Sequence, residues 1–141
     1  MWRQIMSNVY VRNRKKTKFD VVTNAEKLQY DITLYVMNER LVPKKWRYMI
    51  GGELIAKIDE LNDNVIAANS IYATTEKDLE TRKTYQQRAI INGYQLQRRL
   101  ARLIRCVPSA TASSLEDIIT LLEEEIKDIK GWRKNDKIVG R

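Results

Sequence analysis

Histidine is missing from this chain of 141 residues, and only one cysteine is present. Histidine is the commonest general base and metal ligand in proteins, so its absence argues against a zinc site and against a carboxylate–histidine di-iron centre. Cys106 cannot form a disulfide within the chain, and no serine has a visible base and orienting group. Glu53, Asp59, Glu60 and Asp63 are interpreted as a solvated face rather than a metal site. We therefore expect a non-enzyme without metal or cofactor.

Glycine, proline and long apolar stretches are also scarce. Five glycines and two prolines are few for a β-rich protein, and the abundant leucine, isoleucine, alanine, glutamate, lysine and arginine favour helix. No apolar run approaches the roughly 18 residues that a membrane span needs. The first residues are too polar for a signal peptide. The composition predicts one all-α domain that is soluble and cytoplasmic.

The first two helices are expected over residues 23–40 and from Pro43 to about Tyr72. The tetrad at 23–26, Thr-Asn-Ala-Glu, has the form of a capping box, and proline fits the first turn of a helix but not its interior. Gly51-Gly52 inside the second helix indicates a kink or close approach to a neighbouring helix or subunit. The core positions expected on these helices are Ala25, Leu28, Ile32, Tyr35 and Val36, then Leu54, Ile58, Leu61, Val65, Ala68 and Tyr72.

The remaining two helices are expected on either side of Pro108. The third follows a hinge at residues 73–75 and ends at Val107, because proline disfavours helix in the residue before it. The fourth should open with a second capping box at 113–116, present Glu123-Glu124-Glu125 mainly away from the core, and end at Gly131. Its expected apolar seam is Ile119, Leu122, Ile126 and Ile129.

Four amphipathic helices with short connections fold most simply as an antiparallel four-helix bundle. The chain then divides into a basic arm (1–19), the bundle (20–132) and a basic tail (133–141). The arm holds six basic residues and no acidic one. It fits either a solvated terminus or an electrostatic arm for a phosphate backbone.

The third helix has one basic face and one apolar face. Between Thr81 and Val107 there are seven basic residues and no acidic one. At about 100° per residue, one arc holds Arg88, Arg98, Arg99, Arg102 and Arg105, and the opposite arc holds Ile90, Leu96, Leu100, Leu103, Ile104 and Val107. A stripe of one charge costs self-repulsion, so it indicates an acidic partner, most often nucleic acid.

Two further features bear on that interpretation. Tyr94 lies near the arginines on the helical wheel, and aromatic rings with guanidinium groups suit single-stranded bases and phosphates. The alternative is ion pairing with acidic residues within or between subunits, for which the acidic fourth helix is the candidate. Lys44, Lys45 and Arg47 form a second basic cluster with Trp46 and Tyr48, whose rings serve equally well as packing anchors.

Three short motifs carry a family resemblance over about residues 20–135. The segment 41–51, Leu-Val-Pro-Lys-Lys-Trp-Arg-Tyr-Met-Ile-Gly, resembles the junction between helices 1 and 2 of the accessory variability determinants, the four-helix-bundle accessory proteins of diversity-generating retroelements. Gly131-Trp132-Arg133-Lys134 resembles the end of helix 4 in that family, and residues 67–70 resemble its small-residue stretch. The ribosomal intervening-sequence proteins share the same bundle and compete with this assignment.

The resemblance implies a specific function. Members of the retroelement family form a five-subunit barrel with a positive surface, bind the reverse transcriptase and nucleic acid, and support mutagenic cDNA synthesis and retrohoming. By position, Lys44, Lys45 and Arg47 match the family's basic junction, and Arg133 and Lys134 match its basic tail. The arginines of the third helix match no family motif, and the first residues of the chain depart from the family.

These observations favour a cytoplasmic, homo-oligomeric accessory protein that binds RNA and DNA through phosphate contacts and partners a reverse transcriptase. The alternative is a protein-interaction bundle of the ribosomal intervening-sequence type, without a reverse-transcriptase partner. The expected nucleic-acid-binding residues are Lys44, Lys45, Arg47, Arg88, Arg98, Arg99, Arg102, Arg105, Arg133 and Lys134.

Overall fold

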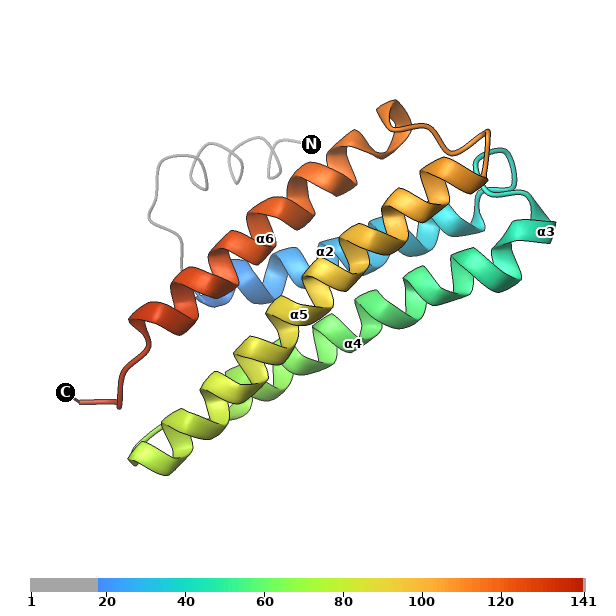
Figure 1. The fold of residues 1–141 in the computed structure, drawn as a ribbon. Helices are drawn as coiled ribbons and strands as arrows, with labels where there is room; N and C mark the ends of the chain where they lie inside the picture. Colours follow the sequence, from blue (N-terminus) through green and yellow to red (C-terminus); the bar gives the residue numbers. More distant parts are fainter. Residues whose placement is uncertain (1–17, 141) are drawn as a thin grey trace, which may run out of the picture.

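The computed structural model describes residues 18–140, which form four long helices and no strand (Figure 1). The long helices are α2 (Lys18–Met37), α4 (Gly52–Ser70), α5 (Glu76–Cys106) and α6 (Glu116–Asn135). The short elements are α3 (Lys44–Trp46), the π-helical turn η1 (Arg47–Gly51) and the 3₁₀ turn η2 (Ser113–Leu115). The predicted all-α helical bundle is confirmed for this part of the chain. The predicted basic arm lies outside it, apart from its last two residues.

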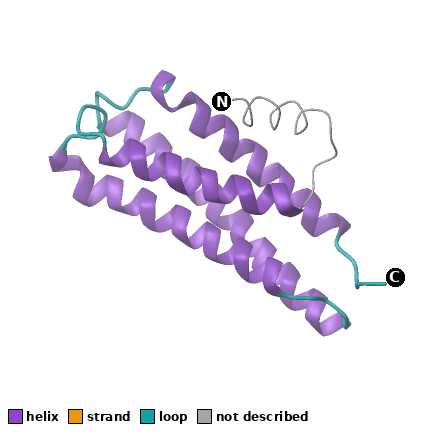
Figure 2. Ribbon diagram, turned by 180° about the vertical axis from the view of Figure 1, so that it is seen from behind, coloured by secondary structure: helices purple, strands orange, loops and turns teal. Residues whose placement is uncertain are grey.

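The four long helices form a ring of contacts around one core. α5 packs between α4 and α6, and α2 contacts the same two helices from the other side (Figures 1 and 2). Across residues 18–140, none of the helices combines the length and the apolar character that a membrane crossing requires.

The apolar spacing predicted the core well. All five positions expected on the first helix are buried, as are those expected on the second up to Ala68. Tyr72 is exposed, because α4 ends at Ser70 and the ring no longer follows the helical face. On α5 the expected apolar arc is buried, with Ile104 only partly so.

Two predicted helix starts are wrong. Thr23 lies inside α2, which is already helical at Lys18, so its hydroxyl does not cap a helix end. The box at 113–116 does not form either. Thr111, one position before Ala112, accepts a hydrogen bond from the backbone N–H of Ser114 at 3.1 Å, and α6 begins only at Glu116 after η2.

The predicted ends of the first and last helices also move. α2 stops at Met37, three residues before the expected Arg40. Gly131 does not end the last helix, because α6 continues to Asn135. One glycine in a helix costs only about 1 kcal/mol relative to alanine. Partial burial of Trp132 against the core and a hydrogen bond from Arg133 to the carbonyl of Lys83 hold the turn that follows.

Two glycines allow helices to approach closely. A Cβ added at Gly51 would lie 2.6 Å from Cγ1 of Val36 on α2, so the expected close approach at this position is to a helix of the same chain. A Cβ at Gly93 of α5 would lie 2.6 Å from Cγ1 of Ile126 on α6. The contact at Gly93 was not predicted, although an isolated glycine in a strongly periodic helix is a usable signal.

The start of α5 is held by an N-cap at Thr75 that was not predicted from the sequence. The Thr75 hydroxyl accepts a hydrogen bond from the N–H of Asp78 at 3.1 Å, and the Asp78 carboxylate accepts from the N–H of Thr74 at 3.3 Å. Hydrogen bonding by the Thr75 side chain, then by the Thr74 backbone, lowers the pKa of Asp78 from its ordinary value of 3.8.

Replacing Gly93 with alanine is expected to destabilise the protein. Overpacking against the β-branched Ile126 costs about 1–3 kcal/mol, which outweighs a gain in helix propensity of at most about 1 kcal/mol. Gly131→Ala is the matched control, since nothing lies within 4 Å of its added Cβ, and it should be neutral or stabilising. Urea unfolding measures both. Equal effects of the two variants, or an unchanged cost of Gly93→Ala in an Ile126→Ala background, would contradict the close contact.

Thr75→Ala is expected to destabilise the bundle by about 1 kcal/mol, the usual cost of removing an N-cap, and to raise the pKa of Asp78 toward 3.8. Because that pKa is lowered by folding, the carboxylate's contribution is present above its unfolded pKa and is lost as the pH falls through the folded one. An NMR titration of Asp78, with unfolding measured at acid and neutral pH, tests this. An unchanged Asp78 titration in the variant would exclude the cap as the cause.

Candidate nucleic-acid interface

Four arginines gather on the C-terminal part of α5, and we call Arg98, Arg99, Arg102 and Arg105 the arginine cluster. They lie opposite the buried Leu96, Leu100 and Leu103, so core packing turns their guanidinium groups outward. Together with Glu53, Ala101 and Cys106 they line a surface hollow of about 670 Å³.

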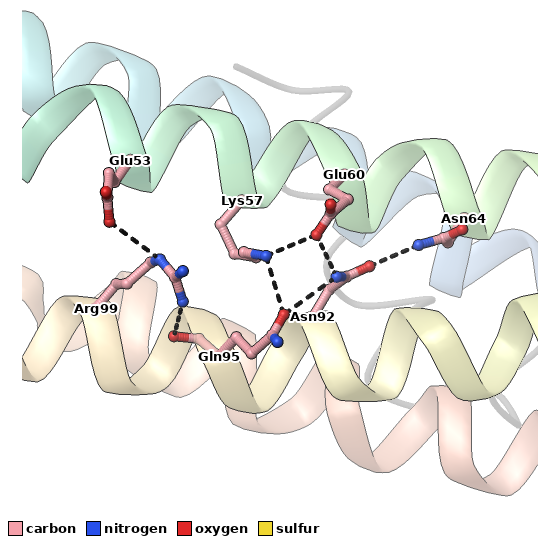
Figure 3. Close-up of polar contacts among 7 residues, drawn as sticks. All are labelled: Glu53, Lys57, Glu60, Asn64, Asn92, Gln95 and Arg99. Atoms are coloured by element: carbon pink, nitrogen blue, oxygen red, sulfur yellow. Dashed lines mark hydrogen bonds and ion pairs between the residues drawn. The ribbon is translucent and has the colours of Figure 1, made fainter.

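One carboxylate from a neighbouring helix enters this cluster. The Glu53 carboxylate on α4 accepts a hydrogen bond from Nη2 of Arg102 at 2.8 Å and lies 3.5 Å from Nε of Arg99 (Figure 3 draws the contact with Arg99). The side chains of Glu53 and Arg102 are 52% and 47% exposed, so this pairing contributes little to stability. Among residues 18–140, Arg98 and Arg105 have no carboxylate at ion-pair distance. The hollow therefore keeps an excess of positive charge.

The alternative prediction was that the arginines form ion pairs within the protein. Two of them, Arg99 and Arg102, do so, but with a different partner from the one expected. The expected acidic neighbour was the last helix, whereas the observed partner is Glu53 on α4. The expectation that Glu125 faces away from the core is wrong, since its side chain is fully buried.

A second polar group joins α4 to α5 farther along the bundle, and we call Lys57, Glu60, Asn64, Asn92 and Gln95 the amide network (Figure 3). Asn92 is 5% exposed, donates to Glu60 at 2.6 Å and accepts from Asn64 at 2.7 Å. Lys57 donates to Glu60 at 2.7 Å and to Gln95 at 3.0 Å. These groups satisfy one another and fix the register of the two helices.

Arg88 belongs to this second region. Together with the residues of the amide network it lines a separate hollow of about 400 Å³, and its guanidinium lies 5.4 Å from the centroid of the Tyr85 ring. The predicted stripe is thus divided into the arginine cluster and the isolated Arg88, with the amide network between them. Tyr94 does not line the hollow of the cluster; the centroid of its ring lies 5.2 Å from the ammonium of Lys130 on α6.

The predicted acidic face is more structured than expected. Asp59 accepts a hydrogen bond from Gln29 of α2 at 2.7 Å, and Glu60 belongs to the amide network. These carboxylates cross-link helices rather than facing only solvent. Across residues 18–140, no group of three or more acidic or cysteine side chains is arranged to hold a metal ion.

The basic junction lies at the same end of the bundle as the arginine cluster (Figure 1). Lys44 and Lys45 are exposed, with the Lys45 ammonium 5.3 Å from the Trp46 ring centroid. Arg47 donates to the carbonyls of Val36 at 3.2 Å and Val42 at 3.3 Å. Its guanidinium therefore holds the end of α2 and the loop that follows.

The basic tail lies at the opposite end. Arg133 is partly buried and donates to the carbonyl of Lys83 at 3.2 Å, while Lys134 is exposed. The predicted nucleic-acid-binding residues therefore do not form one site. The arginine cluster shares one end of the bundle with Lys44 and Lys45, whereas Arg47 and Arg133 bind backbone carbonyls.

A buried ion pair between α5 and the C-terminal tail was not predicted from the sequence. Arg82 of α5 donates from Nε to Asp136 at 2.6 Å and from Nη1 to the carbonyl of Ile71 at 3.0 Å. Gln86 donates to the same carboxylate at 2.9 Å, and the N–H of Val139 donates to the carbonyl of Ala73 at 2.9 Å. The C-terminal segment is thereby fastened to the connection between α4 and α5. Nothing in the sequence pairs residues 82 and 136.

Comparison with known proteins adds no assignment: no family model matches the chain, and no curated protein or solved structure is significantly similar to it.

Arg82→Met is expected to destabilise the protein by about 3–5 kcal/mol, since it leaves the buried Asp136 carboxylate without its main partner. The two side chains are each 8% exposed. Asp136→Asn should cost a similar amount, and the double variant should cost less than the sum. Lys134→Ala, an exposed cation nearby, is the control and should change little. Additive single effects in urea unfolding would show that the two side chains act independently.

Proposed function

We propose that this protein is a non-catalytic accessory protein that binds RNA and DNA and partners a reverse transcriptase in a diversity-generating retroelement, supporting mutagenic cDNA synthesis and retrohoming. The observation that carries the nucleic-acid part is the arginine cluster: four guanidinium groups around one hollow, where Glu53 is the single lining carboxylate among residues 18–140. The reverse-transcriptase part is supported by the sequence resemblance of residues 41–51 and 131–134.

In this proposal the contacts are electrostatic. Guanidinium groups bind phosphate oxygens in a bidentate manner and carry no sequence information there. Lys44 and Lys45 extend the positive surface at the same end of the bundle. Binding of this kind releases counterions and weakens steeply with salt.

The proposed assembly is a cytoplasmic homopentamer of antiparallel bundles. The order of contacts between α4 and α5 supports the antiparallel arrangement, since Glu53 meets Arg99 whereas Asn64 meets Asn92. Repetition of the arginine cluster by symmetry would raise avidity, because each further site binds at a high effective concentration.

One observation also fits the alternative, a protein-interaction bundle of the ribosomal intervening-sequence type. Tyr30, Leu34 and Met37 are exposed on α2 at spacings of four and three residues. They form a second apolar face on a helix whose other side is already buried in the core, which is typical of a surface that contacts protein. A subunit contact in the proposed pentamer would use such a face as well.

Replacing Arg98, Arg102 and Arg105 with alanine is expected to weaken nucleic-acid binding about equally for unrelated sequences. The salt slope should fall by about 0.7–0.9 for each phosphate that is no longer neutralised. The matched control removes three exposed lysines outside the hollow, Lys77→Ala, Lys127→Ala and Lys137→Ala, with the same change of charge. Fluorescence anisotropy at several salt concentrations measures both. If the control weakens binding as much as the triple variant, net charge and not the cluster is responsible.

The first measurement we expect to discriminate the two functions is the light-scattering mass of nucleic-acid-free protein, repeated with a structured RNA at two salt concentrations. A mass near five subunits, with an RNA complex that dissociates at high salt, supports the retroelement accessory protein. A monomer or dimer indifferent to RNA rejects it and leaves the protein-interaction bundle.

A further inference from the structure

The positive charge on α5 is concentrated rather than extended. Arg98 and Arg105 are seven residues apart, about 10 Å along a helix, and the four guanidinium groups of the cluster share one hollow. The next cation toward the start of the helix is Arg88, ten residues before Arg98 or about 15 Å away. The amide network lies between them, and its Lys57 ammonium and Glu60 carboxylate pair with each other, so it adds no net charge. Such a focused field matches a compact anion of high charge.

We infer that the hollow binds a compact polyphosphate, specifically a triphosphate group, with Glu53 as its displaceable counter-ion. This inference deepens the proposed nucleic-acid function and rests on it only where the triphosphate is the 5′ end of an RNA. A free nucleoside triphosphate is the other source of the same chemistry.

Glu53 gives the site its selectivity for charge. Its carboxylate already neutralises part of the field of Arg99 and Arg102, at 3.5 and 2.8 Å. An incoming anion must replace this intramolecular partner, so an anion with one or two charges gains little by the exchange. A triphosphate presents three adjacent phosphoryl groups and reaches Arg98 and Arg105 as well, which have no competing carboxylate among residues 18–140. The half-exposed Glu53 side chain is free to swing into solvent once displaced.

Cys106 provides a built-in reporter for the hollow. Its thiol is exposed, lines the hollow beside the arginines, and is the only thiol in the chain. A bound triphosphate should shield it from a neutral maleimide.

The experiment titrates the full chain with inorganic tripolyphosphate and with orthophosphate at fixed ionic strength, by calorimetry. We expect one tripolyphosphate per chain and binding of orthophosphate at least about tenfold weaker, since each charge-assisted hydrogen bond is worth roughly a tenfold change. Arg102→Ala should weaken tripolyphosphate binding about tenfold, whereas Glu53→Gln should strengthen it severalfold. Lys127→Ala removes an exposed cation on α6 and should leave it unchanged. Saturating tripolyphosphate should slow the maleimide reaction of Cys106 in the wild type.

Several results would overturn the inference. These are equal affinity for tripolyphosphate and orthophosphate, weaker binding by Glu53→Gln, equal weakening in Arg102→Ala and Lys127→Ala, or an unprotected Cys106. Melting curves confirm that each variant is folded, which is expected because the substituted side chains are largely exposed.

The same assay separates this inference from the proposed function. RNA with a 5′-triphosphate is compared with the same RNA ending in a hydroxyl, and with a free nucleoside triphosphate as competitor. If the RNA binds tightly, and tripolyphosphate neither competes with it nor binds on its own, the triphosphate site is refuted and the nucleic-acid function still stands. Tripolyphosphate and nucleoside triphosphate binding without RNA binding supports the site and refutes the nucleic-acid function.

Discussion

Burial of one side of α5 is the constraint on which the rest of this bundle depends. Leu96, Leu100 and Leu103 are almost completely buried, and a helix that buries these positions must present the residues between them to solvent or to neighbouring helices. Because α5 packs between α4 and α6, its partners lie on both flanks. The arginines point to the surface as a consequence of this packing.

Close contact and polar cross-links then determine how α5 sits against its neighbours. Gly93 lets the backbone of α5 approach Ile126 on α6, and Asn92, one residue before, contacts α4 through Glu60 and Asn64. A helix packed by apolar side chains alone tolerates a shift by one turn. Buried amides do not, because a shifted amide would be left without its partners in a low-dielectric interior. Adjacent residues of α5 thus fix its position on two sides.

The periodicity of the sequence was sufficient to predict the helices, most of their buried faces and the outward direction of the arginines. It depends on local spacing, which a single chain displays directly. Pairings between helices were not predictable in the same way. Glu53 rather than an acid of α6 meets Arg99 and Arg102, and Arg82 finds Asp136 more than fifty residues away. Cap positions failed for a related reason: Thr23 has the right neighbours, yet the helix begins upstream.

Fastening of the C-terminal segment has a consequence for the geometry of any complex. Val139 is held by its N–H to Ala73, beside the start of α5, whereas the arginine cluster lies toward the end of that helix. A helix of 31 residues spans about 45 Å. Position 139 is exposed, so a fluorophore attached there through Val139→Cys, with Cys106 replaced by serine, would lie most of that length away from the cluster. The efficiency of energy transfer from this fluorophore to a ligand labelled at one end would show which end of the ligand lies nearer the cluster, as well as whether the ligand binds.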